Sequence, residues 1–368
     1  MESHNPNKMN NKKSLLMVLG PTEIEPDVLQ AGSLPMEYMR TADFSERLKN
    51  IFANLQYVFQ TGNPVLIYAS SGTGVMEAAV ANFCKRGDSA LFINGGTFGN
   101  RWGQICRLYG LDATEISVPF GNSVDPSDVE KFLKANPNIK AVFATYDETS
   151  SGALTDIETL GDVVHHTSDA LLIVDCVSAL VVEPLLMDKW HIDVAISSSQ
   201  KALAIPPGLG FMAVSPKAIQ AAEANDFRTF YFDVLDSLGN YKRNQTPFTP
   251  PVGLLMQLEK RLEKIQNAGL ETVRRQYYEL TDYLRLQMND IGFSVFAKNP
   301  ANCVSGYYQE KYDALKLVAI LREKYRIEIA PSGGELKNRF FRVGNFGSIT
   351  KENIDYFIQS FKETLDFL

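Results

Sequence analysis

The sequence predicts an α/β fold in which a mostly parallel sheet is flanked by helices and followed by a smaller α+β domain. Short, almost wholly apolar runs alternate with segments whose apolar residues recur at helical spacing, as in sheets buried on both faces. The alternation stops after Thr249-Pro250-Pro251, where a long charged helical stretch begins. At 368 residues the chain also exceeds the length at which one hydrophobic core usually stops growing.

The N-terminal stretch MESHNPNKMNNKKS is polar and lacks the apolar segment of a signal peptide, and residues 1–18 are expected to form a disordered tail. An extended stretch with a turn at Gly20-Pro21 leads into the alternating part. Pro126 stands at a first helical position behind Asp125, which is a favourable capping residue. Helices are expected at 44–59, 73–85, 98–109, 125–134 and 157–166, and strands at 65–69, 89–94, 114–118, 140–145, 170–175, 194–196 and 210–214.

Gly269 interrupts the helical stretch 252–290 and is predicted as the domain boundary. Residues 19–269 would then form the large domain and residues 270–368 a small C-terminal α+β domain. In the small domain, strands are expected at 293–297, 327–331 and 340–344, and helices at 314–324 and 351–367.

Composition limits the partners. Hydrophobic content of 45% and charged content of 21% are ordinary for a globular enzyme. The net charge of −7 argues against nucleic acid or an anionic membrane as a partner. No apolar run is long enough to span a bilayer.

The four cysteines show no CxxC spacing, which favours reduced thiols in a cytoplasmic protein over a disulfide framework or a zinc site. The adjacent His165 and His166 lie on an expected helix, where neighbouring residues face different ways. We therefore expect no metal site.

Ligands of such a sheet bind where its strands end. The strand at 65–69 is followed by Ser70–Gly74, SSGTG, which opens a helix and is suited to a phosphate. It is neither a Walker A loop nor a GxGxxG motif, and a glycine turn used only for packing is the alternative. Phe98, after the next strand, is suited to lie on a planar ring, although an aromatic there is more often part of the core. Thr149 and Ser150, after the strand at 140–145, offer hydroxyl groups or form a turn.

Two further strand ends carry charge. Asp175 ends the apolar strand ALLIVD, where a buried carboxylate is costly unless a cation faces it. Lys201 lies between two apolar strands, in SSSQKALAIPPG. A desolvated lysine loses its proton readily and can then attack a carbonyl, whereas a lone lysine on a turn is usually exposed. A phosphate cradle, a flat aromatic ring, a buried acid and a strand-end lysine together match what pyridoxal 5'-phosphate needs.

From Leu19 onward the sequence resembles the class V, fold-type-I aminotransferases, and among them the alanine–glyoxylate and serine–pyruvate (serine–glyoxylate) group. The most specific match is the spacing from Asp175 to the SQK ending at Lys201, with PPG behind it. The other matching motifs are LGP at Leu19, YVFQTGNP at Tyr57, SGTGVMEAA at Ser71, ETSSG at Glu148, TPFTPPV at Thr246 and FRVGNFG at Phe341.

The resemblance implies a role for each candidate residue. Lys201 would hold the cofactor as a Schiff base and move protons, and Asp175 would hold the protonated ring nitrogen. Arg342 would bind the substrate carboxylate, with Gly20 also at the substrate. Thr249 would reach the phosphate of a partner subunit, which implies a homodimer with shared active sites. The remaining cofactor contacts would be Ser71, Gly72, Thr73 and Gln200 at the phosphate, Phe98 on the ring and Thr149 near its phenolic oxygen.

The activity implied is ping-pong transamination from alanine or serine to glyoxylate or pyruvate. A 2-aminoethylphosphonate–pyruvate aminotransferase is the first alternative. A cysteine-desulfurase-type lyase is the second, although that group has His where Gln200 stands and needs a cysteine in a mobile loop. A non-catalytic binding protein of this fold is a third, against which Lys201, Asp175 and Arg342 argue.

Two places depart from the family pattern. Met39-Arg40 stands where many members have His-Arg, and Tyr146-Asp147 stands where many have His-Asn or His-Gly. Both positions are expected to border the substrate, so fold and cofactor carry over more firmly than substrate.

Overall fold

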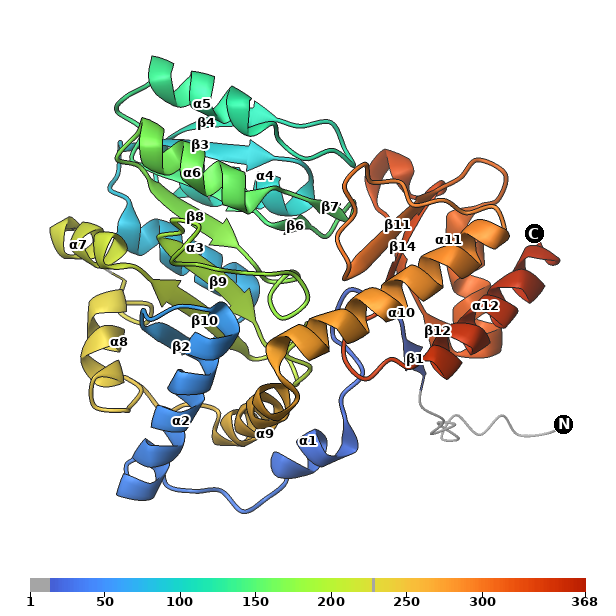
Figure 1. The fold of residues 1–368 in the computed structure, drawn as a ribbon, viewed down its shortest axis with the longest axis horizontal. Coiled ribbons are helices and arrows are strands. Elements are labelled where there is room, and N and C mark those ends of the chain that lie inside the picture. The colour runs from blue at the N-terminus through green and yellow to red at the C-terminus, as the bar shows by residue number, and fades with distance from the viewer. Residues whose placement is uncertain (1–13, 227–228) are drawn as a thin grey trace, which may run out of the picture.

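The computed structural model describes residues 14–226 and 229–368, and its centre is a seven-stranded sheet in the order β2-β10-β9-β8-β5-β3-β4 (Figure 1). The strands from β9 to β4 run parallel, whereas β10 is antiparallel to both β9 and β2. The predicted mostly parallel sheet is confirmed. Its strands are β2 (Val65–Ala69), β3 (Ser89–Asn94), β4 (Asp112–Ser117), β5 (Ala141–Thr145), β8 (Leu171–Asp175), β9 (Val194–Ser198) and β10 (Leu209–Val214).

Alternate residues of these strands enter two different hydrophobic cores, because successive side chains of a strand point to opposite faces. Val142 of β5 belongs to a core shared with α2, α5, α6 and α9, and Phe143 to one shared with α3, α4, α7 and α8. Both faces of the sheet are therefore covered. The helices are α2 (Ala42–Phe59), α3 (Gly72–Phe83), α4 (Thr97–Leu108), α5 (Pro126–Ala135), α6 (Ile157–Thr167), α7 (Pro216–Ala224), α8 (Val234–Tyr241) and α9 (Val252–Ala268).

Several of these helices begin at residues that satisfy their first N–H groups. The Thr41 hydroxyl accepts a hydrogen bond from the Phe44 N–H, and the Asp125 carboxylate accepts one from the Ser127 N–H. Pro126 follows Asp125 at the first helical position, as predicted. The helices predicted around the sheet are confirmed to within a few residues, whereas α7, α8 and the short α1 (Pro26–Ala31) were not predicted.

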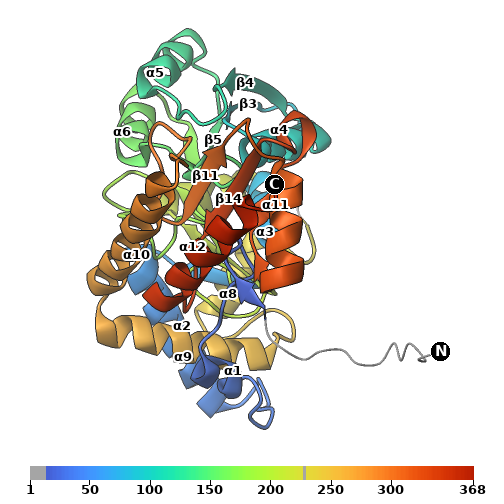
Figure 2. The same ribbon diagram turned by 90° about the vertical axis from the view of Figure 1, so that its right-hand side faces the viewer.

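The C-terminal part builds a second, antiparallel sheet in the order β11-β14-β13. Helices α10, α11 and α12 pack on it around a third core that includes Leu284, Phe341 and Phe361. Figure 2 faces this part of the chain, with α11 and α12 in front of β11 and β14. The bounds are α10 (Leu270–Asp290), β11 (Val304–Tyr308), α11 (Ala314–Ile320), β13 (Ala330–Pro331), β14 (Phe340–Gly344) and α12 (Lys351–Leu365).

The strand predicted at 293–297 is wrong. Within that stretch Val295 makes only an isolated bridge to Tyr307, which belongs to the unpredicted strand β11. Glycine weakens the interior of a strand, so Gly306 in the middle of β11 made this segment unlike a strand in the sequence. The fold nevertheless needs glycine there, because a Cβ at Gly306 would lie 2.7 Å from the Ser151 carbonyl oxygen and 2.5 Å from the Phe340 ring.

The other C-terminal predictions hold in part. The strand expected at 327–331 is divided into β12 (Ile327–Glu328) and β13. The helix expected at 314–324 ends at Ile320 and continues as a π-helical turn, η1 (Leu321–Tyr325). Helix α12 is found where it was expected.

The tail predicted for residues 1–18 ends earlier than expected. Residues 1–13 lie outside the described part of the chain, but Leu15–Leu16 forms β1, which pairs in parallel with β12. Met17 is fully buried in the C-terminal core. Figure 1 shows β1 beside β12, so the described chain begins in the C-terminal part before it crosses to the large sheet.

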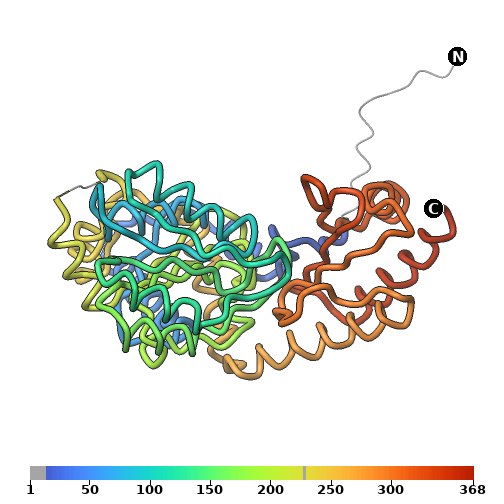
Figure 3. The backbone as a smooth tube through the Cα atoms, turned by 90° about the horizontal axis from the view of Figure 1, so that it is seen from above, coloured from blue at the N-terminus to red at the C-terminus, as the bar shows by residue number. Residues whose placement is uncertain are grey.

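Seen from above, the chain forms two bodies with α10 running along both (Figure 3). Leu270 and Val273, at the start of α10, pack in a core of the large sheet, whereas Leu284 and Met288 pack in the C-terminal core. We propose the domain boundary at Gly269, whose φ of +81° breaks the helical path between α9 and α10.

Candidate active site

Lys201 lies in the loop between β9 and β10, as expected. The loop is tied down because the Ser199 hydroxyl donates to the Pro206 carbonyl (2.8 Å) and the Ala204 N–H donates to the Lys201 carbonyl (2.8 Å). The Lys201 amine donates to the carbonyl oxygen of Leu19. Burial lowers the pKa of Lys201, while the carboxylates of Asp147 and Asp175 act in the opposite direction. The side chain is therefore a held, desolvated amine.

Gly20 packs directly against this lysine. Its φ is +108°, and a Cβ at this position would lie 2.8 Å from the Gln200 carbonyl oxygen and 3.0 Å from Cδ of Lys201. Any side chain here would push Lys201 out of place. The sequence reading had assigned Gly20 only to substrate binding, and the close approach gives it a reason to be glycine.

Asp175 is the last residue of β8 and is 4% exposed. Its Oδ1 accepts a hydrogen bond of 2.8 Å from the Val177 N–H. Burial raises the pKa of Asp175 to about 6, and the charges of Lys201 and Arg101 oppose this rise. A buried strand-end carboxyl group of this kind is stabilised in its charged form by a cation placed opposite it.

The expected phosphate cradle is the start of α3. Ser71 is its N-cap and accepts from the Gly74 N–H at 3.3 Å. A Cβ at Gly72 would come within 3.0 Å of the Val177 side chain, so only glycine leaves this corner open. Nearby, the Ser198 hydroxyl and the side-chain oxygen of Gln200 are buried without a partner in the described part of the chain. Free N–H groups and unpaired polar atoms at a helix start suit a phosphate.

Phe98 stands in the first turn of α4, with the guanidinium of Arg101 4.8 Å from its ring centre. Arg101 also donates to the hydroxyl of Thr73 at 2.9 Å, which links the starts of α4 and α3.

Glu148 is a residue whose role the sequence reading missed. Its carboxylate accepts hydrogen bonds from the N–H groups of Phe98 (3.1 Å) and Gly99 (2.9 Å). These two residues precede Glu148 in the sequence by 50 and 49 positions. It thereby caps α4, because Gly96 at the N-cap has no side chain to do so. A Cβ at Gly96 would lie 2.2 Å from Oγ of Ser150. The motif ETSSG contained the residue, but nothing in the sequence showed which helix it caps.

Arg342 reaches the site from β14 in the C-terminal body. Its Nη1 donates to the Thr149 carbonyl (3.1 Å) and its Nη2 to the Pro331 carbonyl (2.8 Å), while Nε has no partner in the described part of the chain. Burial lowers the pKa of Arg342, against the charges of Glu148 and Asp147. The Thr149 hydroxyl is buried and shares a hydrogen bond of 2.8 Å with Ser178. The charge of Arg342 acts on Lys201, so Arg342 lies near the lysine, with the Thr149 carbonyl as its hydrogen-bond partner.

Thr249, by contrast, does not join the site around Lys201 of its own chain. It is exposed and lines a small recess beside β2, in the loop Thr246–Pro251. Arg40 fixes this loop by donating to the Thr246 carbonyl at 2.8 Å. Met39 packs at the edge of a core of the large sheet.

The two residues of the Tyr146-Asp147 departure point different ways. The Tyr146 hydroxyl donates to the Pro184 carbonyl (2.8 Å), and its ring meets Trp190 edge-on in the core. Asp147, in β6 (Asp147–Glu148), is 1% exposed and acts on the charges of Lys201 and Arg342. Only Asp147 therefore adds a group to the site.

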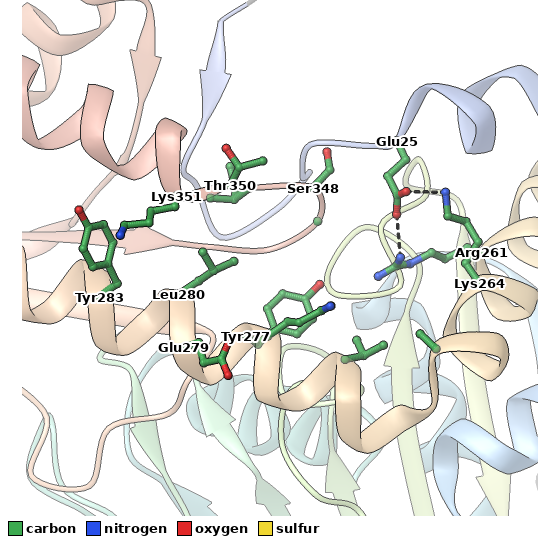
Figure 4. Close-up of a pocket in the computed structure, with 15 residues that line it drawn as sticks. Glu25, Arg261, Lys264, Tyr277, Glu279, Leu280, Tyr283, Ser348, Thr350 and Lys351 are labelled. Carbon is green, nitrogen blue, oxygen red and sulfur yellow. Dashed lines mark hydrogen bonds and ion pairs between the residues drawn. The ribbon is translucent and has the colours of Figure 1, made fainter.

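A separate cavity of about 750 Å³ lies between α9, α10 and the loop before α12 (Figure 4). Glu25 forms ion pairs across it with Arg261 (2.9 Å) and Lys264 (2.5 Å). Neither Lys201 nor Asp175 lines it. Although this cavity is large, it is therefore separate from the candidate active site.

Residues 14–226 and 229–368 contain no cluster of three His, Cys, Asp or Glu side chains that could hold a metal ion. No helix in those ranges has the length and apolarity that crossing a membrane requires.

Comparison with known proteins shows the family to which the chain belongs. The family model described as aminotransferase class-V matches residues 30–335. The chain is 32% identical to the L-aspartate–glyoxylate aminotransferase of Paracoccus denitrificans over 91% of this chain and 87% of the relative. It is 31% identical to the serine–glyoxylate aminotransferase of Methylorubrum extorquens over 91% and 87%. A crystal structure of alanine–glyoxylate aminotransferase from Nostoc sp. superimposes with a TM-score of 0.92 at 28% identity, covering 99% of this chain and 98% of that one.

Proposed function

The chain belongs to the class-V aminotransferase family, and we propose that it transfers the amino group of alanine or serine to glyoxylate or pyruvate by a ping-pong mechanism. The observation that carries this proposal is the desolvated amine of Lys201, on whose charge both the Asp175 carboxylate and the Arg342 guanidinium act. These three groups suit a substrate that carries an amine and a carboxylate on one carbon.

The residues present fit pyridoxal 5'-phosphate. Asp175 is a buried acid suited to a protonated ring nitrogen. The buried Ser198 hydroxyl and Gln200 side-chain oxygen have no hydrogen-bond partner among the described residues, so a phosphate could bind them. When bound, the cofactor supplies a ring that accepts electrons from the substrate Cα. The residues proposed to hold it are Ser71, Gly72, Thr73 and Gln200 at the phosphate, Phe98 and Asp175 at the ring, Thr149 near the phenolic oxygen and Lys201 as the covalent link.

The chain's own groups have three tasks in this proposal. The Lys201 amine would serve as the general base for the proton on the substrate Cα and then, as a general acid, would deliver that proton to the cofactor carbon. Arg342 holds the substrate carboxylate through its planar, bidentate guanidinium. Gly20 leaves room for the Lys201 side chain, because it has no side chain of its own at their contact.

We propose that the active unit is a homodimer with shared sites. Thr249 is exposed and makes no contact with the cradle of its own chain among the described residues, which supports a role at a partner's phosphate. Two exposed apolar side chains lie at this loop: Phe230, 87% exposed, packs on Phe248, and Met36, 69% exposed, lies beside Gly253. Exposed patches of this kind favour a protein interface.

Neither alternative activity is favoured. A desulfurase needs an accessible cysteine, whereas Cys84, Cys106, Cys176 and Cys303 are all buried. A 2-aminoethylphosphonate donor has no carboxylate for Arg342 to bind. The free thiols support our proposal of a cytoplasmic location, with small molecules and a second copy of the chain as partners.

A panel of amino donors tests the proposal. Alanine, serine, aspartate and 2-aminoethylphosphonate are each assayed with glyoxylate and with pyruvate, and phosphonoacetaldehyde is assayed as a further acceptor. Alanine or serine with glyoxylate or pyruvate should give the highest kcat/KM. Turnover with the phosphonate pair alone would refute the proposed substrate class.

A further inference from the structure

Asp147 carries an unexplained buried charge. Its Oδ2 accepts a hydrogen bond from the Cys303 thiol at 3.1 Å. Its Oδ1 is fully covered and makes no hydrogen bond of ordinary geometry in the described part of the chain, although the Ser178 hydroxyl, which donates to the Asp147 carbonyl at 3.2 Å, is close enough to lower the pKa of Asp147. Leaving a buried carboxylate oxygen unpaired is unfavourable, so such an atom calls for a function or a missing partner.

The groups that act on Asp147 come from both bodies of the protein. From the large body these are the charges of Glu148, Glu183 and Lys201, together with the Ser178 hydroxyl. From the C-terminal body they are Cys303 and Arg342. Among the charges that act on Lys201, that of Asp147 is the strongest, ahead of Asp175.

Asp147 also titrates in the physiological range. Burial raises the pKa of Asp147 to about 7, and the neighbouring carboxylates of Glu148 and Glu183 add to the rise. The hydrogen-bonding side chains of Ser178 and Cys303 act in the opposite direction. The carboxyl group is therefore neutral below neutral pH and charged above it.

The proposed reaction fixes where the substrate's side chain must lie. The amino group is at Lys201 and the carboxylate at Arg342, and both residues feel the charge of Asp147. The side chain branches from the same carbon, so we expect it to lie within range of the Asp147 charge. A second carboxylate there would meet a like charge at short range, in surroundings where such repulsion is weakly screened.

We propose that Asp147 is a specificity-determining residue that admits amino donors with a neutral side chain and rejects those with an acidic one. This inference rests on the proposed function and narrows its substrate class to neutral amino acids. One relative, from Paracoccus denitrificans, is named for aspartate, so family membership alone does not decide between the two classes.

The first test is the ratio of kcat/KM for alanine to that for aspartate, measured on the holoenzyme from pH 6 to 9. The ratio should rise by about tenfold or more as Asp147 ionises, with a midpoint near 7. Aspartate's own side chain is ionised throughout this range. Titration of Lys201 affects both substrates and cancels in the ratio.

Asp147→Asn removes the charge and keeps the shape. Its ratio should be independent of pH and about tenfold below that of the native protein at pH 8.5. Glu183→Gln is the matched control, because Glu183 is another buried acid of this region but bonds to Asn302 (2.6 Å) and Tyr278 (3.2 Å). It should keep the pH dependence, with the midpoint moved to lower pH because one neighbouring negative charge is gone.

Binding provides a readout that does not depend on turnover. Calorimetric titration of the holoenzyme with succinate and with propionate should show succinate weakening from pH 6 to 8.5 relative to propionate, and this loss should vanish in Asp147→Asn. The native protein alone provides the test if the variant does not fold. If no donor is turned over, the proposed function fails while the succinate titration still decides the role of Asp147.

The inference is overturned if the alanine-to-aspartate ratio and the succinate affinity do not change with pH. It is also overturned if Asp147→Asn alters only the absorption spectrum of the cofactor and leaves the ratio as in the native protein. Asp147 would then face the cofactor and not the substrate side chain.

Discussion

The guanidinium of Arg342 donates a hydrogen bond of 3.1 Å to the backbone carbonyl of Thr149. This contact joins the C-terminal body to the segment that follows β5 in the large sheet. The proposed carboxylate site therefore exists only while the two bodies are held together. An incoming substrate would meet an arginine already aligned by the Thr149 and Pro331 carbonyls.

Lys201 is expected to be the one lysine that the cofactor labels. Borohydride reduction of the holoenzyme should fix the cofactor on the peptide that contains Lys201, as seen by mass spectrometry. Lys201→Ala should lose at least about 1,000-fold in kcat, because the nucleophile and the proton carrier are the same group. Lys217→Ala is the control, because the Lys217 amine donates to the Ala170 carbonyl at 2.7 Å and has no proposed part in the reaction. This variant should keep the reduced adduct on Lys201. A reduced adduct on any other lysine contradicts the assignment.

Asp175→Asn should lower activity far more than it lowers cofactor content. The amide keeps the shape of the side chain but removes the charge that holds a ring nitrogen protonated. Cofactor content is measured after alkaline release, and kcat with alanine and glyoxylate. Native-like turnover in this variant would leave Asp175 with a structural role only.

Arg342→Lys and Thr249→Ala should have opposite effects. Arg342→Lys loses the bidentate geometry, so KM for the amino acid should rise by about tenfold or more while the cofactor spectrum stays unchanged. Thr249→Ala should loosen cofactor retention and affect substrate use less. Light scattering should show a dimer for both. An active monomer would refute the shared site, and unchanged amino-acid kinetics in Arg342→Lys would move the carboxylate site elsewhere.

Glu148→Ala should destabilise the protein by about 1–3 kcal/mol, because the first N–H groups of α4 lose their acceptor in a buried place. Urea unfolding measures the free energy. The control is Glu115→Ala, since Glu115 is exposed on the edge strand β4 and should change stability much less. Equal losses in the two variants would show that the cap of α4 contributes little.

Gly20→Ala should reduce kcat by about 100-fold, because the new methyl group would displace Lys201. Gly87→Ala is the matched control: Gly87 also has a positive φ, +86°, but a Cβ there meets nothing within 4 Å. It should cost about 1–2 kcal/mol of stability without loss of activity. Similar kcat values in both variants would mean that Gly20 serves only its backbone conformation.

The sequence predicted what depends on local patterns. The apolar runs placed the strands of the large sheet, and the polar residues at their ends placed Lys201, Asp175 and the start of α3. What it could not supply depends on contacts between distant segments. The capping of α4 by Glu148 and the burial of Gly306 against Ser151 belong to this class. For Tyr146-Asp147 the pattern marked the pair, but the turn between β5 and β6 decides that only Asp147 faces the lysine.

The pairing of β1 with β12 sets an order for biosynthesis. Leu15 and Leu16 leave the ribosome more than 300 residues before their partners Ile327 and Glu328. The segment at Leu19 and Gly20, which closes over Lys201, directly follows β1. The large sheet can form during translation, but the lysine stays uncovered until Ile327 and Glu328 have been made. A nascent chain halted before residue 327 would therefore hold a folded sheet with an unfinished active site.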